Sequence, residues 1–248
     1  MENEKPQVTI YIIIYNNADE LPVTIDSVME QTITDAEIIL SDDGSRNYDI
    51  RILEEYAERL RKKYSRVRIN INEQNVGTVK HLNKVLKMAE GQYLLTCASG
   101  DAFAAADSVE KIVNRFKKKN LQILTTRRLE VGKGKKVRPS LLVGIFLLIA
   151  PGKLLDYMIQ KKNVISGCCT FYRKDLFEQY GYFDEKYHLV EDYPYYVMLL
   201  QKKVKIGWSS MVSIRHRMGG VSTGKIHPSI YKDIELMRES LQENKADR

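Results

Sequence analysis

The sequence contains little cysteine, and this scarcity excludes two classes of protein. Only Cys97, Cys168 and Cys169 occur among 248 residues, and the last two are adjacent. Because no CxxC pair and no Cys/His ligand spacing is present, we expect neither a disulfide framework nor a structural zinc site. Hydrophobic residues make up 44% of the chain, which is enough for one sizeable core or two small ones.

Long apolar runs are also missing. The longest stretch, LLVGIFLLIAP at residues 141–151, is shorter than the roughly 20 residues that span a bilayer. The first residues, MENEKPQ, lack the basic and then apolar segments of a signal peptide. We therefore expect a cytoplasmic protein. A buried helix is the simpler interpretation of residues 141–151, and peripheral contact with the inner face of a membrane is the alternative.

Two common nucleotide-binding motifs are absent as well. No GxGxxG follows the first apolar run, and no GxxxxGK followed by Ser or Thr occurs. These absences disfavour a dinucleotide-binding Rossmann site and a P-loop. The net charge of +7 keeps nucleic acid, anionic membranes and phosphorylated substrates open as partners.

Basic residues are concentrated between residues 127 and 138. They are Arg127, Arg128, Lys133, Lys135, Lys136 and Arg138. Such a run is commonly a solvated loop, and the alternative is a contact with lipid or substrate phosphates. Because the segment lacks an aromatic-rich platform or a known nucleic-acid-binding module, we expect no nucleic-acid partner.

Strand and helix patterns alternate through the first hundred residues. Apolar runs at 8–14, 36–41, 67–71 and 93–97 predict strands, and stripes at helical spacing lie between them. Gly91 is placed to end the third helix. This order predicts an α/β fold with a mostly parallel central sheet and helices on both faces.

Each of the four predicted strands is followed by polar, turn-forming residues. These are Tyr15-Asn16-Asn17, Asp42-Asp43-Gly44-Ser45, Asn75-Val76-Gly77 and Ser99-Gly100-Asp101. Any one of them could be an ordinary turn. Since ligands of open α/β sheets bind outside the carboxyl ends of the strands, four together indicate a binding site. A carboxylate such as Asp101 at this edge favours Mg²⁺ or Mn²⁺ together with substrate phosphate oxygens.

Several stretches resemble the family-2 glycosyltransferases with the GT-A fold. They are IIIYNNADELPVTIDSVMEQT, EIILSDDGS, NVGTVKHLNKVLKMAEGQYLL, ASGDAF, GYFDEKYHLVEDYPYYVMLL and IRHRMGGVST. The resemblance covers roughly residues 7–223. It implies a single GT-A domain over 1–225, with a nucleotide-sugar half at 1–110 and an acceptor half at 111–225. Apolar residues at helical spacing further predict an amphipathic helix at 226–248.

The resemblance also implies a donor site for a nucleotide-sugar, most simply a UDP-sugar. In the family, residues at the positions of Tyr15 and Asp43 lie against uracil and ribose, and Asn16 belongs to the same strand end. The family's DxD metal motif reads Ser99-Gly100-Asp101 here, so the first carboxylate is missing. Asp101 is the expected ligand of Mn²⁺ or Mg²⁺, and Ser99 offers a neutral oxygen.

The expected catalytic base is Asp192, next to Glu191 in LVEDYPYY. A neighbouring carboxylate can raise the pKa of a base towards its working range. The alternative is that Asp192 caps a helix that begins at Tyr193, since Asp is a good N-cap. The resemblance further places His216 at the metal or pyrophosphate and Gly167 in the sugar or acceptor pocket, and we expect Glu191 to line that pocket as well. For His216, a purely structural role is the alternative.

These features predict an inverting glycosyltransferase that acts on a glycan or lipid-linked acceptor, as in surface polysaccharide synthesis. The alternative is a non-catalytic GT-A domain that binds a nucleotide-sugar or a partner protein. The missing first carboxylate favours the alternative. Retention of Asp101, Asp192 and His216 favours the enzyme.

Overall fold

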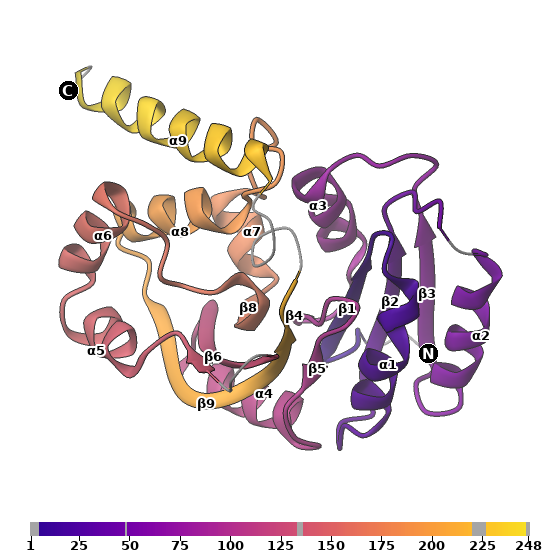
Figure 1. Ribbon diagram of the computed structural model, residues 1–248. Coiled ribbons are helices and arrows are strands. Elements are labelled where there is room, and N and C mark those ends of the chain that lie inside the picture. The colour runs from indigo at the N-terminus through magenta and orange to yellow at the C-terminus, as the bar shows by residue number, and fades with distance from the viewer. Residues whose placement is uncertain (1–4, 48, 133–135, 220–226, 247–248) are drawn as a thin grey trace.

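One continuous sheet with helices on both faces organises the molecule. The structure is a computed structural model that describes residues 5–47, 49–132, 136–219 and 227–246. Its sheet has the strand order β3-β2-β1-β4-β8-β6-β9-β5, and β7 pairs with β6 (Figure 1). The division at residue 110 stays a prediction, because the sheet runs through both halves.

The first half is the parallel α/β unit that the sequence predicts. Its strands β1 (Val8–Ile14), β2 (Ala36–Asp42), β3 (Arg66–Ile71) and β4 (Tyr93–Thr96) pair in parallel. The connections are η1 (Ala18–Glu20) and α1 (Leu21–Met29), then α2 (Arg51–Arg61), then α3 (Thr78–Met88). Alternate residues of β1 serve the two faces of the sheet. Ile10 packs in the core beneath α1 and α2, whereas Tyr11 packs with α3 and α8.

The chain after β4 adds mixed pairing to this sheet. Its strands are β5 (Ala102–Phe103), β6 (Ile123–Val131), β7 (Lys136–Arg138), β8 (Thr170–Arg173) and β9 (Ile206–Arg217). Its helices are α4 (Ser108–Lys119), α5 (Leu141–Ile149), α6 (Pro151–Gln160), η2 (Gly167–Cys169), α7 (Asp175–Tyr180) and α8 (Asp192–Gln201). Strand β8 runs antiparallel between β4 and β6, and β9 runs parallel to β6. The mostly parallel sheet is therefore confirmed, with antiparallel additions.

The predicted tail helix is present as α9 (Pro228–Ala246). It lies along the outer side of α8 (Figure 1). Met237 is fully buried in the core that α8 shares, and Ile234 and Leu241 pack against the same core. The apolar stripe of α9 thus faces the domain, as the periodicity indicates.

The predicted role of Gly91 as a helix terminator is wrong. Helix α3 ends at Met88, and the next residue, Ala89, already has extended backbone geometry. A Cβ atom on Gly91 would lie 2.3 Å from the backbone nitrogen of Thr9. The Gly91 amide also donates a hydrogen bond to Thr9 Oγ1 at 2.9 Å. Glycine is needed there because the chain passes directly against β1.

Gly91→Ala should therefore destabilise the protein by about 1–3 kcal/mol, the usual cost of overpacking a tight core. Gly152→Ala is the matched control, because a Cβ atom on Gly152 in α6 meets no described atom within 4 Å. Alanine in a helix is favoured over glycine by up to about 1 kcal/mol, so this control should be neutral or stabilising. Urea denaturation of both variants tests the difference, and equal stabilities would contradict the close approach.

Candidate active site

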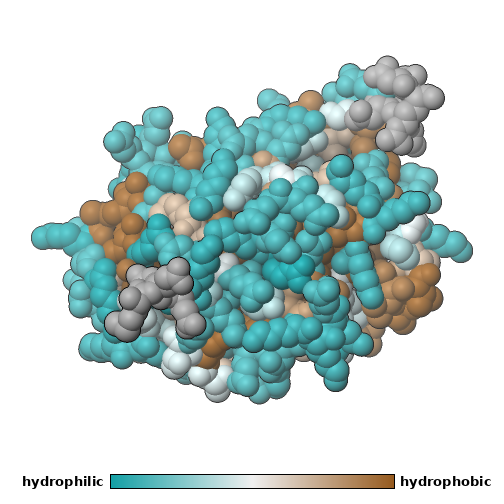
Figure 2. Space-filling model, turned by 180° about the vertical axis from the view of Figure 1, so that it is seen from behind, coloured by the Kyte–Doolittle hydropathy of each residue, from teal (hydrophilic) through white to brown (hydrophobic). Residues whose placement is uncertain are grey.

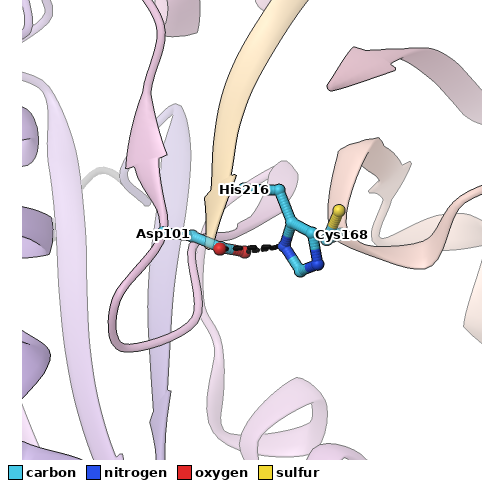
Figure 3. Close-up of side chains that lie close together, drawn as sticks. All are labelled: Asp101, Cys168 and His216. Carbon is cyan, nitrogen blue, oxygen red and sulfur yellow. Dashed lines mark hydrogen bonds and ion pairs between the residues drawn. The ribbon is translucent and has the colours of Figure 1, made fainter. Parts of the chain in front are cut away.

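The loop after β4 and the carboxyl end of β9 meet at Asp101. This residue follows β4, and β5 then pairs with the end of β9 through Ala102 and Arg215. The pairing brings Asp101 beside His216, the next residue of β9. The two Asp101 oxygens lie 2.9 Å and 3.0 Å from His216 Nδ1, and the Arg217 amide donates to Asp101 Oδ1 at 2.9 Å (Figure 3).

The electrostatics of this pair follow from its burial. Burial raises the pKa of Asp101, against the hydrogen bond from His216. Burial alone would lower the pKa of His216, but the Asp101 hydrogen bond and the neighbouring Cys168 together raise it to about 10. His216 Nε2 is buried and has no hydrogen-bond partner among the described residues. The imidazole is thus held by Asp101 at Nδ1, whereas its Nε2 atom has no hydrogen-bond partner in the described part of the chain.

Cys168 lies on that side of the imidazole. One donor atom each from Asp101, Cys168 and His216 lies within 4.8 Å of the other two (Figure 3). A hydrogen bond from Cys169 lowers the pKa of Cys168 well below that of an ordinary thiol, against the effect of burial and with further help from His216 and Arg128. Oxygen, nitrogen and sulfur donors at this spacing fit a divalent cation. The sequence predicts Asp101 and His216 as ligands; Cys168 was missed because neighbouring cysteines carry no ligand spacing.

A cavity of about 510 Å³ opens beside this cluster. Gly167, Glu191, Asp192 and His216, which are all predicted site residues, line it together. Other lining residues include Tyr11, Thr96, Arg128, Asn163, Cys168, Ile230 and Ile234. The structure therefore brings the predicted base and the predicted metal ligand into one cavity, although they are 24 residues apart along the chain.

Asp192 faces this cavity from the first residue of α8. Glu191, and not Asp192, occupies the N-cap position of this helix. Asn163 Nδ2 donates to Asp192 Oδ2 at 3.2 Å. A Cβ atom on Gly167 would lie only 2.9 Å from the same oxygen. The helix therefore begins one residue earlier than the helix-cap alternative requires, and Gly167 leaves the room that the carboxylate occupies.

The two neighbouring carboxyl groups titrate differently. Burial raises the pKa of Asp192 to about 6, against hydrogen bonds from Tyr193 and Asn163. Burial, and then the charge of Asp192, raises the pKa of Glu191 to about 8. Of the two carboxyl groups, Asp192 therefore loses its proton at a lower pH than Glu191 does. A carboxylate with a pKa just below neutral is suited to general-base chemistry.

Helix α9 fixes the loop that leads to these carboxyl groups. Asp233 is buried, and its carboxylate accepts hydrogen bonds from three consecutive backbone amides, those of His188, Leu189 and Val190, at 2.7–3.1 Å. The next residue is Glu191. The sequence predicts only a packed amphipathic helix here; its contribution to the site could not be found from periodicity.

The residues that are predicted to bind the nucleotide-sugar lie at the strand ends and do not line this cavity. Tyr15 is 48% exposed, which leaves its ring free to stack on a base. The Asn16 amide donates to Ser45 Oγ at 2.7 Å, joining the ends of β1 and β2. The Ser99 hydroxyl donates to the Asn17 carbonyl at 2.8 Å, so it supports the loop rather than facing His216. Donor binding by these residues stays a prediction.

Asp43 has a different environment from the one expected. Its buried carboxylate accepts four hydrogen bonds, from the side-chain amides of Asn72 and Asn75 and the backbone amides of Val76 and Gly77, at 2.8–3.2 Å. A carboxylate has about four acceptor positions, and all are used by the chain. In this geometry Asp43 shapes the loop after β3, and a direct contact with the nucleotide stays a prediction.

A protein-family model, Glycosyl transferase family 2, matches residues 9–181. The chain belongs to glycosyl transferase family 2. Among curated relatives, a cholesterol galactosyltransferase of Borreliella burgdorferi is 33% identical over 50% of this chain and 33% of its own length. The glycosyltransferase EpsJ of Bacillus subtilis is 27% identical over 77% of this chain and 55% of its own length. The chain thus spans between a third and about half of these two relatives.

Solved structures confirm the GT-A fold of this family-2 chain. TarS residues 1–349 of S. aureus in complex with UDP match with a TM-score of 0.68 and 20% identity, over 93% of this chain and 64% of that one. A mannosyltransferase of Pyrobaculum calidifontis in complex with GDP-Man and Mn²⁺ matches with a TM-score of 0.57 and 14% identity. The latter match covers 85% of this chain and 56% of the other.

Asp43→Ala should destabilise this family-2 domain. The substitution leaves the buried Asn72 amide and the buried Gly77 N–H without acceptors, and each such loss costs about 1–3 kcal/mol. We expect the free energy of unfolding to fall by about 2–5 kcal/mol in urea denaturation. Asp19→Ala, at an exposed aspartate of η1, is the control and should change stability little. An Asp43→Ala protein as stable as the wild type would show that the four bonds are not maintained.

Proposed function

We propose that the chain is an inverting glycosyltransferase that moves a sugar from a nucleotide-sugar, most simply a UDP-sugar, to a glycan or lipid-linked acceptor. The observation that carries this proposal is the shared cavity of Asp192 and His216. The lining of this cavity combines the Asp192 carboxyl group with the cation donors His216 and Cys168. The solved relatives bind UDP, UDP-GlcNAc or GDP-Man, which agrees with a nucleotide-sugar donor.

The roles of the residues follow from their positions. Asp192 would accept the proton of the acceptor hydroxyl as that oxygen attacks the anomeric carbon. The bond from this carbon to the diphosphate oxygen breaks on the opposite side, so the configuration inverts and no glycosyl-enzyme forms. Glu191, whose pKa burial and the charge of Asp192 raise, can in its protonated form donate a hydrogen bond to a sugar hydroxyl without adding a second charge beside the base.

The unsatisfied Nε2 atom of His216 fits the cation expected for this family. Asp101 and His216 would hold Mn²⁺ or Mg²⁺. When bound, the ion offsets the negative charge that develops on the departing diphosphate. Tyr15 and the loops joined through Asn16 would hold the nucleotide at the neighbouring strand ends. The proposed acceptor is a surface polysaccharide or a glycolipid. The proposed pathway is the synthesis of that molecule.

Asp192→Asn tests the enzyme against the non-catalytic alternative. The amide keeps the size of the side chain and removes the basic oxygen, so turnover should fall about a hundredfold or more. UDP binding with Mn²⁺, measured by calorimetry, should be unchanged. In the wild type the rate should fall as pH drops through about 6, because protonation of Asp192 removes the base.

Asp156→Asn, at an exposed aspartate of α6, is the matched control and should keep wild-type turnover. The assay needs an acceptor on which the wild type is active. Wild-type turnover by Asp192→Asn would remove this residue from the mechanism, and Glu191 would then be the next residue to test.

We further infer that α5 contacts the surface of an anionic membrane. Its exposed apolar side chains are Leu141, Leu142, Ile145, Phe146, Leu148 and Ile149, with exposed fractions from 41% to 76%. A hydrophobic patch is visible on the side of the molecule where α5 lies (Figure 2). Within the described residues, each helix is too short or too polar to cross a bilayer. The apolar face therefore fits contact along a membrane surface.

The basic segment contributes less to this face than the sequence suggests. Arg127 Nε donates to the Pro139 carbonyl at 3.0 Å, and Arg128 Nη2 donates to Glu130 Oε1 at 3.0 Å and lines the cavity. Arg128 therefore faces the cavity, whereas Arg127 is half-buried. Lys136 and Arg138 are exposed, whereas Lys133 and Lys135 lie outside the described residues.

Co-sedimentation with liposomes tests the α5 surface. Leu142→Ser and Ile149→Ser together should reduce binding to vesicles that contain anionic lipid, since each change removes exposed apolar area. Salt should weaken the remaining attraction, which is worth about 1 kcal/mol per basic residue. Val23→Ser, at a residue that is 54% exposed in α1, is the control. Binding that ignores both the α5 changes and the lipid charge would contradict the inference.

A further inference from the structure

The cation site lacks a donor that its motif would ordinarily supply. Ser99 stands where a carboxylate is expected, and its hydroxyl is committed to the Asn17 carbonyl at 2.8 Å. Asp101 and His216 alone would leave a divalent ion with two protein ligands. Cys168 Sγ is the additional donor in the described part of the chain that reaches them.

The two adjacent cysteines have different surroundings. Cys169 is fully buried, and its sulfur lies 3.5 Å from the backbone carbonyl oxygen of Thr126 and 3.6 Å from that of Ser166. Cys168 instead lines the cavity. Its sulfur lies 3.5 Å from Ser166 Oγ and 3.8 Å from Arg128 Nη1. Cys169 therefore belongs to the core, and Cys168 presents its sulfur to the site.

The spacing of the three donors suits one ion. Zinc–sulfur bonds of about 2.3 Å and zinc–nitrogen bonds of about 2.0–2.1 Å place two donors of the same ion no more than about 4.4 Å apart. The donors of Asp101, Cys168 and His216 already lie within 4.8 Å of one another. Side-chain movements that release the hydrogen bond between Asp101 and His216 Nδ1 would close the site around one ion.

We propose that Cys168 is the third protein ligand of this cation and takes the place of the carboxylate missing at Ser99. The site would then combine oxygen, nitrogen and sulfur donors. Mg²⁺ prefers oxygen ligands, whereas thiolate and imidazole favour Zn²⁺ and Co²⁺. The site would accordingly favour these ions over Mg²⁺ and keep open positions for diphosphate oxygens. This inference rests on the proposed function only for the role of the ion.

Co²⁺ titration of the metal-free protein, without nucleotide, tests the ligand directly. A thiolate bound to Co²⁺ gives a charge-transfer band in the near ultraviolet. We expect this band in the wild type and its loss in Cys168→Ser, together with at least a tenfold loss of Zn²⁺ affinity in a competition assay. Cys97→Ala, which removes another buried thiol, should keep the band.

Two further variants make the result specific. Asp101→Asn should weaken Co²⁺ binding and keep a thiolate band at saturating metal. Cys168→Asp should abolish the band and raise the affinities for Mn²⁺ and Mg²⁺ relative to Zn²⁺, because the site becomes richer in oxygen donors. Thermal melting of each metal-free variant checks that it is folded.

The outcomes separate this inference from the proposed function. A wild-type protein that binds Co²⁺ without a charge-transfer band, or a Cys168→Ser variant with unchanged Zn²⁺ affinity, would overturn the role of Cys168. Asp101→Asn would still show whether the cation site exists. Turnover by Asp192→Asn tests the glycosyltransferase proposal independently, since that carboxylate is not among the three donors.

Discussion

The short antiparallel pairing of β5 with the end of β9 is the constraint on which the site depends. It joins Ala102 to Arg215 and Phe103 to Ile214, so a loop that follows the parallel half is held against a strand contributed more than a hundred residues later. Asp101 and His216 meet because they flank this pairing. Their hydrogen bond is therefore a consequence of sheet register, and neither residue could keep its position if β9 slipped by one residue.

The part of the cavity lining that holds the two neighbouring carboxyl groups depends on a second long-range contact. Asp233 of α9 holds the three amides before Glu191, while Asn163 contacts Asp192. The base is thus oriented by the tail helix and by the segment before η2. An acceptor hydroxyl must be positioned accurately against the anomeric carbon, since small displacements of reacting groups cost large factors in rate. Side chains that are held firmly in place meet this requirement.

The sequence predicted the parts of this molecule that local pattern determines. The four parallel strands, their polar ends and α9 follow from periodicity and turn chemistry, which act over a few residues. It could not predict what distant segments contribute. Glycine is needed at position 91 because the chain passes close to the backbone of Thr9. The Asp43 carboxylate accepts its hydrogen bonds from the loop after β3. Arg128 turns into the cavity and donates a hydrogen bond to Glu130. Cys168 enters the site only because η2 lies beside β9.

The pKa of Asp192 also distinguishes a carboxyl group with a chemical role from one with a purely structural role. Folding raises the pKa of Asp192 from 3.8 to about 6. The folded state therefore binds a proton more tightly than the unfolded chain does, and stability from this group is lost as pH rises through that range. A carboxylate that only stabilised the fold would have its pKa lowered, as partnered aspartates do. At neutral pH the protein keeps Asp192 ionised at a cost in stability, which is expected of a side chain retained for its chemistry.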